Sequence, residues 1–522
     1  MDDAPLVPPP VPPPETPWYR TPFFGRLILL ALPPLGLWIV WRDLDRTRGQ
    51  KILATVFTGF WLIPYLVLVL LGASALDLIG IEFRGGFGPS LVRRPTVPNY
   101  TVVEQARRAQ ALYEPLPLQR TNPVVRLKPY WTDFRGPRRN GIYAERPILT
   151  EWPLNGLPRL WRIPCGGGYA SFVVARGLAV TIEQRRDQET VVAYELDTGR
   201  EVWATSYPAH FTEWMGGDGP RATPTCFEDF IYSLGAAGDL RCLSLDRGTV
   251  LWEKNVLADT GAENLHYGLA CSPIMVGRNV VVLSGQGARN QAVVAYDFLT
   301  GERRWAALSD TMAYTSPALV ELAGRPQLLL VTARRALGLD LETRQVLWDY
   351  PWQVQYDNAI AMPVLVSTNR FTISAGYGTG AALVEIRPDG AGFRAAELWR
   401  NRNLKNKFNA SVFWQGHLYG LDEGVLCCVN ALTGERVWRE GRYGYGQILL
   451  AEGHLFVLSG DGDLALVPAT PSGFVQKHRV QALSGKTWNV PAFAHGRLLL
   501  RNSAEMTCFD LRRRRNDDPA TW

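Results

Sequence analysis

The chain has 522 residues, of which 47% are hydrophobic and 20% are charged, and its formal net charge is +6. This composition is ample for a large folded core together with additional segments. The positive charge is small and scattered along the sequence, which excludes nucleic acid as an expected partner.

Residues 1–22 are rich in proline, with the run VPPPVPPPETP at residues 7–17. A tract of this composition cannot build a packed core, and it predicts an extended, disordered tail. A ligand for a proline-binding partner is the alternative.

Two apolar segments follow, at Leu27–Trp41 and Ile52–Leu76. The second exceeds the ~20 residues that cross a bilayer. The first is shorter and contains Pro33 and Pro34. It is long enough to cross the bilayer only if the Arg26 side chain extends to the headgroups. We predict a transmembrane helical hairpin over residues 23–80, with the lipid bilayer as a partner. A buried hairpin of a soluble protein is the alternative.

The loop between the two segments is basic, which predicts the orientation of the hairpin. It carries Arg42, Arg46, Arg48 and Lys51, and short basic loops remain in the cytoplasm. Everything after residue 80 is then expected on the periplasmic or extracellular side of the inner membrane. Further arginines follow the second apolar segment, and they reduce the difference in positive charge between its two ends.

Residues 81–130 mix proline, arginine and glycine with one helical stretch, Val102–Tyr113. This pattern predicts a linker that contains a short amphipathic helix. Residues 514–522 are expected to form a second tail.

A repeated unit organises the rest of the chain, and its clearest copy is Val191–Trp203, VVAYELDTGREVW. A β-branched and aromatic run predicts one strand, and Asp197-Thr198-Gly199 predicts a tight turn. A returning strand then begins at Glu201 and brings in a large indole. Further copies end at Trp252, Trp305, Trp348 and Trp438, with a worn copy at Trp399.

A second signal precedes each hairpin, namely a small or proline-containing step before an apolar run, as in TPTCF at Thr223 and SPIMV at Ser272. About eight such steps occur at intervals of roughly 36 to 52 residues, which is the period of a four-stranded propeller blade. We therefore predict an all-β fold, an eight-bladed β-propeller over residues 131–513.

The ring is also predicted to close. The last repeat ends at Cys508–Leu511 without a returning tryptophan strand, while Leu160–Ile163 lies unpaired ahead of the first blade. Pairing these segments would remove two open edges. Seven tryptophans are then expected to be buried between blades as structural residues: Trp161, Trp203, Trp252, Trp305, Trp348, Trp399 and Trp438.

Repeats of the form A-x-D-x-x-T-G-x-x-x-W resemble the PQQ-like (pyrroloquinoline quinone) β-propeller repeat. Trp131-Thr-Asp-Phe-Arg-Gly-Pro also resembles the segment that precedes the ring in many bacterial members. The resemblance implies the fold but not one activity. The family includes quinoprotein alcohol dehydrogenases and also the lipoprotein scaffold that helps assemble outer-membrane β-barrels.

Aromatic and basic residues fall just before the inner strands, where a propeller lines the mouth of its channel. Eight blades bring these loops to one end, which favours an anionic or flat ligand. Loop capping and hydrogen bonding between blades are the alternative. The candidate ligand-binding residues are Tyr169, Asp218, Arg221, Tyr267, Tyr314, Asp357, Asn358, Lys405, Lys407, Arg442, Lys486 and Trp488.

The dehydrogenase alternative makes further demands on this mouth. The resemblance implies PQQ with a Ca²⁺ ion held by carboxylate and amide oxygens, together with an Asp base, a Trp floor and an Arg on the quinone. Asp218, Asp357, Asn358, Arg221 and Trp488 have that chemistry, but their surroundings do not match the dehydrogenase motifs, and no haem motif is present. No catalytic residue is assigned, and a cofactor is expected only under this alternative.

The seven cysteines show no C-x-x-C spacing and the histidines do not pair at ligand spacing, so no metal site is predicted. Buried free thiols are expected. The resemblance suggests a disulfide between adjacent Cys427 and Cys428, as quinoprotein dehydrogenases carry over their cofactor. Strand alternation would instead point these two thiols to opposite faces.

Taken together, these features predict a membrane-anchored propeller that acts as a non-catalytic binding or scaffold module of the cell envelope. Its expected partners are envelope proteins or a polymer ligand. A PQQ-dependent alcohol dehydrogenase is the alternative.

Overall fold

The computed structural model describes residues 21–43, 45–76, 79–85, 89–93, 95–112, 128–153, 156–390 and 392–513. The chain divides into two compact units, one of residues 1–81 and 91–94, and the other of residues 82–90 and 95–522. The predicted tails at 1–22 and 514–522 lie outside the described residues, except for residues 21 and 22.

The first unit is mainly helical, and its first apolar segment differs from the prediction. It forms two helices of ten residues each, α1 (Pro22–Ala31) and α2 (Pro33–Arg42). The break falls at Leu32, because a residue that precedes proline is driven away from helical backbone angles. Each helix is about 15 Å long, half the thickness of a bilayer core. The predicted transmembrane hairpin is therefore not confirmed.

The second apolar segment forms one long helix, α3 (Arg48–Ala75). The side chains of Thr47 and Gln50 form a capping box at its start, which satisfies amides that the helix itself leaves free. In the part of the chain that the structure describes, α3 is the one helix long and apolar enough to cross a membrane. After it, β1 (Gly80–Phe83) and β2 (Pro89–Val92) form a two-stranded sheet.

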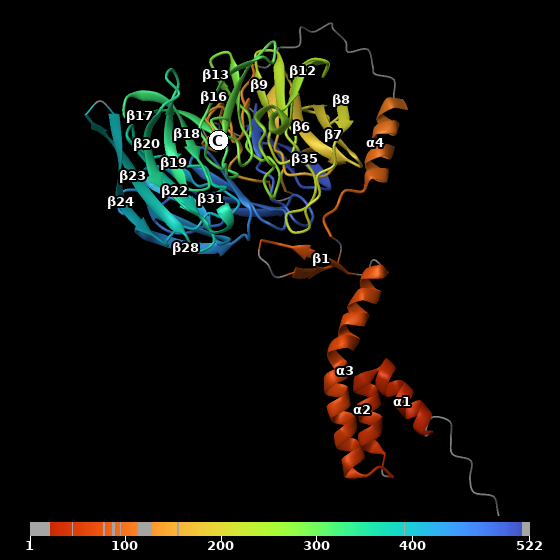
Figure 1. Ribbon diagram of the computed structural model, residues 1–522. Helices are drawn as coiled ribbons and strands as arrows, with labels where there is room; N and C mark the ends of the chain where they lie inside the picture. The colour runs from red at the N-terminus through yellow and green to blue at the C-terminus, as the bar shows by residue number, and fades with distance from the viewer. Residues whose placement is uncertain are drawn as a thin grey trace, which may run out of the picture. The chain divides into compact units, whose positions relative to one another are not determined.

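The second unit is an eight-bladed β-propeller, which confirms the predicted fold (Figure 1). Eight sets of four antiparallel strands among the described residues form the blades, each beginning with its inner strand, and in blade 7 the short strand β3 (Ile142–Tyr143) is added in parallel to β29. These inner strands contact one another around the ring, β5 with β9, β9 with β13, β13 with β17, β21 with β25, β25 with β29, and β33 with β5.

The strands of blades 1 to 4, from the inside outward, are β5 (Val173–Ala175), β6 (Leu178–Arg185), β7 (Gln188–Glu195) and β8 (Glu201–Pro208); β9 (Thr225–Phe227), β10 (Phe230–Leu234), β11 (Asp239–Ser244) and β12 (Val250–Asn255); β13 (Ile274–Val276), β14 (Asn279–Leu283), β15 (Val293–Asp297) and β16 (Arg303–Ala307); and β17 (Ala318–Leu322), β18 (Arg325–Val331), β19 (Arg335–Asp340) and β20 (Val346–Pro351).

Those of blades 5 to 8 are β21 (Val364–Leu365), β22 (Arg370–Ala375), β23 (Gly380–Asp389) and β24 (Gly392–Asn401); β25 (Val412–Trp414), β26 (His417–Asp422), β27 (Val425–Asn430) and β28 (Arg436–Arg442); β29 (Gln447–Ala451), β30 (His454–Leu458), β31 (Asp463–Pro468) and β32 (His478–Gln481); and β33 (Ala492–Ala494), β34 (Arg497–Arg501), β35 (Glu505–Asp510) and β4 (Arg159–Pro164). Two short helices, α5 (Val256–Thr260) and η2 (Gln355–Asp357), lie in connections.

The predicted ring closure is confirmed by β4, which is the outer strand of the last blade. It pairs antiparallel with β35, with Trp161 opposite Cys508 and Ile163 opposite Met506. The Trp161 indole also donates a hydrogen bond of 2.9 Å to the Leu196 carbonyl in blade 1. One strand from the start of the ring therefore holds its last blade against its first.

The apolar core lies between blades rather than at the axis. One cluster joins blades 1 and 2, where Trp203 contacts the group that contains Ile231 and Leu243. Similar clusters join blades 2 and 3, 3 and 4, 4 and 5, 5 and 6, and 6 and 7. A larger cluster spans blades 7, 8 and 1. Each blade is thus buried on both faces by its neighbours, which leaves the loops at the channel ends free to vary.

Most of the predicted tryptophan plugs are buried. Trp161, Trp203, Trp252, Trp348 and Trp438 are each at most 8% exposed. Trp203 and Trp252 donate hydrogen bonds of 2.9 and 3.0 Å to the carbonyls of Leu245 and Phe298 in the next blade. Trp305 and Trp399 are half-buried, which is less than predicted.

The residue at the position of the turn glycine distinguishes Trp305 from Trp203. Gly248 has a φ of +67°, and a Cβ there would collide with the ring of Trp203. The glycine is therefore the surface on which the preceding blade's indole rests. In blade 4 the corresponding residue is Arg344, with a φ of 62°. Its guanidinium lies 4.4 Å from the Trp305 ring centroid, and the Trp305 N–H has no hydrogen-bond partner among the described residues.

Changing Arg344→Gly is expected to stabilise the protein by about 1 kcal/mol. Glycine relieves the left-handed backbone and removes the side chain that Trp305 now meets. Chemical denaturation with tryptophan fluorescence measures the effect, and an unchanged or lower free energy of unfolding would contradict this explanation.

A loop at residues 131–143 crosses the channel and binds several blades. The Val174 amide donates to the Trp131 carbonyl, and the Cys226 amide donates to the Thr132 carbonyl, both at 2.8 Å. The buried Arg139 donates to the Pro317 carbonyl at 2.9 Å. The loop ends in β3 (Ile142–Tyr143), which pairs in parallel with β29. Because its contacts reach blades 1, 2, 4 and 7, this segment forms a floor inside the ring.

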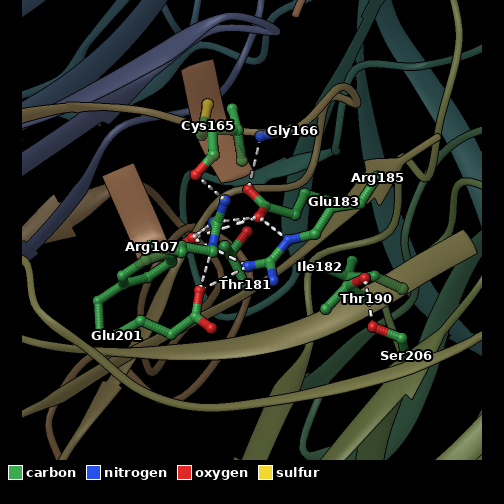
Figure 2. Close-up of polar contacts among 12 residues, drawn as sticks. Arg107, Cys165, Gly166, Thr181, Ile182, Glu183, Arg185, Thr190, Glu201 and Ser206 are labelled. Atoms are coloured by element: carbon green, nitrogen blue, oxygen red, sulfur yellow. Dashed lines mark hydrogen bonds and ion pairs between the residues drawn. The ribbon is translucent and has the colours of Figure 1, made fainter. Parts of the chain in front are cut away.

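The predicted linker contributes to the propeller unit as well. Its helix, α4 (Tyr100–Leu112), carries Arg107, which donates to Glu183 at 2.8 Å and also to Glu201 (Figure 2). Arg185 bridges the same two carboxylates at 2.6 and 2.8 Å. Burial raises the pKa of Glu183, but the charges of Arg185, Arg107 and Arg501 outweigh it and lower that pKa to about 2. α4 is thus fixed to blade 1.

All seven cysteines are free and buried, as expected. Cys427 packs in the cluster between blades 5 and 6, and Cys428 in the cluster between blades 6 and 7. The two thiols therefore point to opposite faces of β27. Burial raises the pKa of Cys427 to about 12 and that of Cys428 to about 11, which keeps both protonated.

Candidate functional site

The loops that lead into the inner strands surround a cavity of about 700 Å³ at the mouth of the channel. Blades 1 to 8 all contribute, and Phe134 of the floor loop also lines it. A cavity of this size accepts a small organic ligand. Its walls are formed by Phe83, Gly85, Phe134, Tyr169, Met215, Gly216, Arg221, His266, Tyr267, Ala270, Tyr314, Ser316, Gln355, Tyr356, Asp357, Asn358, Ile360, Tyr377, Lys407, Phe408, Gln447, Trp488 and Val490.

Aromatic rings make up much of the wall. Trp488 stacks on Tyr169 with ring centroids 5.7 Å apart, and it lies 4.7 Å from Phe408. Across the cavity, Tyr267 meets Tyr314 edge to face at 5.6 Å. Flat apolar groups can be desolvated between such rings.

Two cations line this wall and a third lies close to it, and each of the three donates to a backbone carbonyl. Arg221 donates to the backbone carbonyls of Gly217, at 2.6 Å, and Gly219. Lys407 donates to the Gly85 carbonyl, and its ammonium lies 4.6 Å from the Tyr377 ring centroid.

The third cation is Lys486, which lies behind Trp488 rather than on the cavity wall itself. Its ammonium is 3.3 Å from the Gly216 carbonyl and 4.1 Å from the Trp488 ring centroid. None of the three cations forms an ion pair with a carboxylate in the described ranges.

Burial lowers the pKa of Arg221 and that of Lys407. The charges of Glu213 and Asp218 offset part of this effect on the pKa of Arg221, and that of Glu423 does so for Lys407. A buried cation with no carboxylate in contact is costly, so the site favours an anion.

Gln447 is buried and holds two blades in place around the cavity. Its Nε2 donates to the carbonyls of Phe408 and Trp488, both at 2.8 Å. This fixes the orientation of the amide, and its Oε1 has no hydrogen-bond partner among the described residues. An acceptor is thereby left in the wall of the cavity.

Backbone strain is concentrated on the blade 5 side. Tyr356 and Asp357 have φ values of 62° and 54°, and Tyr377, in the neighbouring turn, has a φ of 56°. Left-handed backbone is unfavourable for such side chains and accumulates at functional sites. Asn358 is buried and donates to the Tyr377 hydroxyl at 3.3 Å, which ties the two strained segments together.

The structure brings together eight of the predicted ligand-binding residues on the cavity wall: Tyr169, Arg221, Tyr267, Tyr314, Asp357, Asn358, Lys407 and Trp488. Lys486 lies directly behind Trp488, as described above.

Three predicted residues do not line the cavity, each for a local reason. Asp218 is exposed, and its carboxylate accepts the Glu213 amide. Lys405 forms an ion pair of 2.6 Å with Asp422. Arg442 is exposed at the end of β28, because that outer strand runs further than its sequence pattern indicates.

Several cavity residues were not predicted. Phe83 and Gly85 come from the presumed linker, and no repeat signal marks them. Phe134 lies in the segment that resembles the family's lead-in, which offered a signal for the floor. Phe408 and Gln447 belong to the inner-strand approaches of blades 6 and 7, beside predicted positions.

Residues 187–440 match the family model described as outer membrane protein assembly factor BamB. The resemblance to PQQ-like β-propeller proteins is confirmed. The chain is similar to the structure of BamB from Moraxella catarrhalis, with 15% identity over 69% of this chain and 98% of that chain, and a TM-score of 0.49. No curated protein matches the chain.

Two dehydrogenase structures are also similar to it. A europium-containing methanol dehydrogenase shares 13% identity over 71% of this chain and 89% of its own, with a TM-score of 0.43. A quinohemoprotein alcohol dehydrogenase from Comamonas testosteroni shares 11% identity over 79% and 85%, with a TM-score of 0.42. These similarities do not distinguish a scaffold from a dehydrogenase.

The Ca²⁺ ion of the PQQ-like dehydrogenases does not fit the donors of this cavity. Asp357 is the one carboxylate among the cavity-lining residues, and the described residues contain no cluster of three or more His, Cys, Asp or Glu. Ca²⁺ takes six to eight oxygen ligands, several of them carboxylates. The adjacent cysteines also lie inside blade 6 instead of facing the cavity.

Proposed function

We propose that this protein is a membrane-anchored, non-catalytic binding or scaffold module of the cell envelope, and that its channel mouth binds an aromatic anion. The observation that carries the proposal is the set of three cations, Arg221, Lys407 and Lys486, held by neutral groups around an aromatic cavity. An anionic group would supply their counter-charge, and the rings would bury a flat body.

A scaffold role agrees with the family model, whose description concerns outer-membrane assembly. Under this proposal the bound anion is part of an envelope protein, a polymer or a small molecule. Substrate turnover is not part of it, because the cavity lacks the carboxylates of a quinone–calcium site.

The test uses the full-length protein in lipid nanodiscs, titrated with 2-naphthoate and with its neutral analogue 2-naphthamide. The proposal expects calorimetric binding of the carboxylate and binding of the amide that is at least tenfold weaker, with empty discs as the baseline. Equal affinity for the two compounds, or no binding, would overturn it. PQQ with Ca²⁺, alcohols and an artificial electron acceptor provides the competing arm, in which turnover would establish the dehydrogenase.

The anchor belongs to the same proposal. α3 supplies a span of sufficient length, and four basic residues lie before it or in its first turn: Arg42, Arg46, Arg48 and Lys51. The positive-inside rule then keeps the start of α3 in the cytoplasm, whether or not α1 and α2 also enter the bilayer. We therefore place the propeller on the periplasmic or extracellular side of the inner membrane.

Alkaline phosphatase fused after Trp522 is expected to be active in a bacterial host. Moving the basic loop across the membrane would carry its charges against the potential, at ~2.3 kcal/mol per charge per 100 mV. An inactive phosphatase fusion, together with a fluorescent cytoplasmic reporter at the same position, would show that the orientation is wrong.

A further inference from the structure

A short segment ahead of the propeller contacts one cation of the cavity, Lys407. We call Glu82–Gly85 the mouth strap. The Gly85 carbonyl accepts a hydrogen bond from the Lys407 ammonium, and Phe83 lines the cavity beside it. Phe83 also meets the exposed Trp214 edge to face, at 5.0 Å. Part of the ligand cavity is therefore occupied by the chain itself.

Polar contacts that lie outside the cavity hold the strap in place. Arg84 forms ion pairs with Glu82, at 2.8 Å, and with Asp461 of blade 7, at 2.5 Å. The buried Glu82 accepts the Thr96 amide at 2.9 Å, and the Thr96 hydroxyl in turn accepts the Lys486 amide at 2.6 Å. The strap is therefore tied through Thr96 to the backbone of Lys486, while its Gly85 carbonyl contacts the Lys407 ammonium.

Gly85 permits the close approach that this arrangement needs. Its φ is +99°, and any Cβ at this position would overlap the ring of Tyr445. The Lys407 ammonium itself lies 4.8 Å from the same ring. The Gly85 backbone, the Lys407 ammonium and the Tyr445 ring therefore lie close together. A side chain on residue 85 would push the backbone away from the ring.

We propose that the mouth strap is an internal competitor for the anionic ligand, which binds by replacing the Gly85 carbonyl on Lys407. This inference rests on the proposed function and goes further, because it assigns the primary anion contact and a regulatory segment. A carboxylate adds a charge–charge attraction to the hydrogen bond that the neutral Gly85 carbonyl now makes with the ammonium, so the exchange is favourable once the strap yields. The occupied site then differs from the free one in the position of the strap.

Two variants loosen the strap without removing a cation. Arg84→Ala deletes its ion pairs, and Gly85→Ala forces the backbone away from Tyr445. In titrations of the full-length protein with 2-naphthoate, Arg84→Ala is expected to lower the Kd roughly two- to fivefold, as for an exposed ion pair. Gly85→Ala is expected to lower it further. Arg479→Ala, which removes the exposed pair with Asp463 on the same blade, is the matched control with unchanged Kd.

Lys407→Met tests the assigned contact and is expected to raise the Kd for 2-naphthoate at least tenfold. Lys405→Met is the control and is expected to leave the Kd unchanged, because Lys405 is paired with Asp422. In the Lys407→Met background, Arg84→Ala should no longer change the Kd, because the two residues act on one exchange.

Two kinds of failure are distinguishable. If wild type and every variant fail to bind 2-naphthoate, the proposed function fails. If wild type binds but Arg84→Ala and Gly85→Ala leave the Kd unchanged or raise it, the strap is no competitor, and this inference alone is overturned.

Discussion

Replacing Trp203 with alanine is expected to lower the free energy of unfolding by about 3–5 kcal/mol. The indole is 8% exposed and lies in the apolar cluster between blades 1 and 2. Its removal leaves a cavity next to Gly248 and an unpaired Leu245 carbonyl. Denaturant titration followed by circular dichroism measures the loss.

Trp305→Ala is the matched control, because this residue has the same position in its repeat but a different environment. It is half-buried, and its N–H makes no hydrogen bond to any described residue. The expected loss is therefore no more than half of that for Trp203. Equal losses at the two sites would contradict the role assigned to the turn glycine.

Replacing Leu160–Ile163 with Gly-Ser-Gly-Ser is expected to lower the melting temperature by roughly 10 °C or more. The change removes the Trp161 plug and weakens the β4–β35 pairing that joins the first and last blades. Because the full chain is retained, the floor loop and α4 remain present. Thermal unfolding by circular dichroism, together with limited proteolysis, reports whether the ring still unfolds as one unit.

The same replacement in His478–Gln481 provides the comparison. This segment, β32, is also the outer strand of a blade, but it directly follows the strands β29 to β31 of that blade in sequence. A much smaller decrease is expected there. If both replacements destabilise the protein equally, β4 has no special role in closure.

The fold could be predicted from the sequence because every copy of the repeat has the same structural requirements. Each copy carries an apolar strand, a turn and one indole, and the indole can be buried only by another copy. The strand at Leu160–Ile163 was identifiable since the last repeat lacks its own tryptophan strand, and the structure places it there. The first apolar segment was harder, because composition alone does not show that Pro33 and Pro34 divide it into two helices.

The candidate site was predictable where it follows the repeat. Tyr169, Tyr267, Tyr314 and Trp488 precede inner strands, and the ring brings them together. Lys405 and Lys407 illustrate the limit of this reasoning, because both lie in one loop and their sequence positions are equivalent. Only the structure shows that Lys405 pairs with Asp422, whereas Lys407 lines the cavity.

Contacts made by non-repeated segments leave no signal of this kind. The mouth strap and the floor loop each bind several blades, and their partners are set by tertiary packing that the repeat does not encode. Arg344 is intermediate, because its departure from the turn glycine is visible in the sequence while its effect on Trp305 is not.

The most direct test of the account is a structure of the full-length protein determined with bound 2-naphthoate. We predict the naphthalene ring in the channel-mouth cavity against Trp488, with its carboxylate within hydrogen-bond distance of the Lys407 ammonium and the mouth strap displaced. A cavity without ligand at saturating concentration, or a carboxylate bound away from Lys407 and Arg221, would contradict the account.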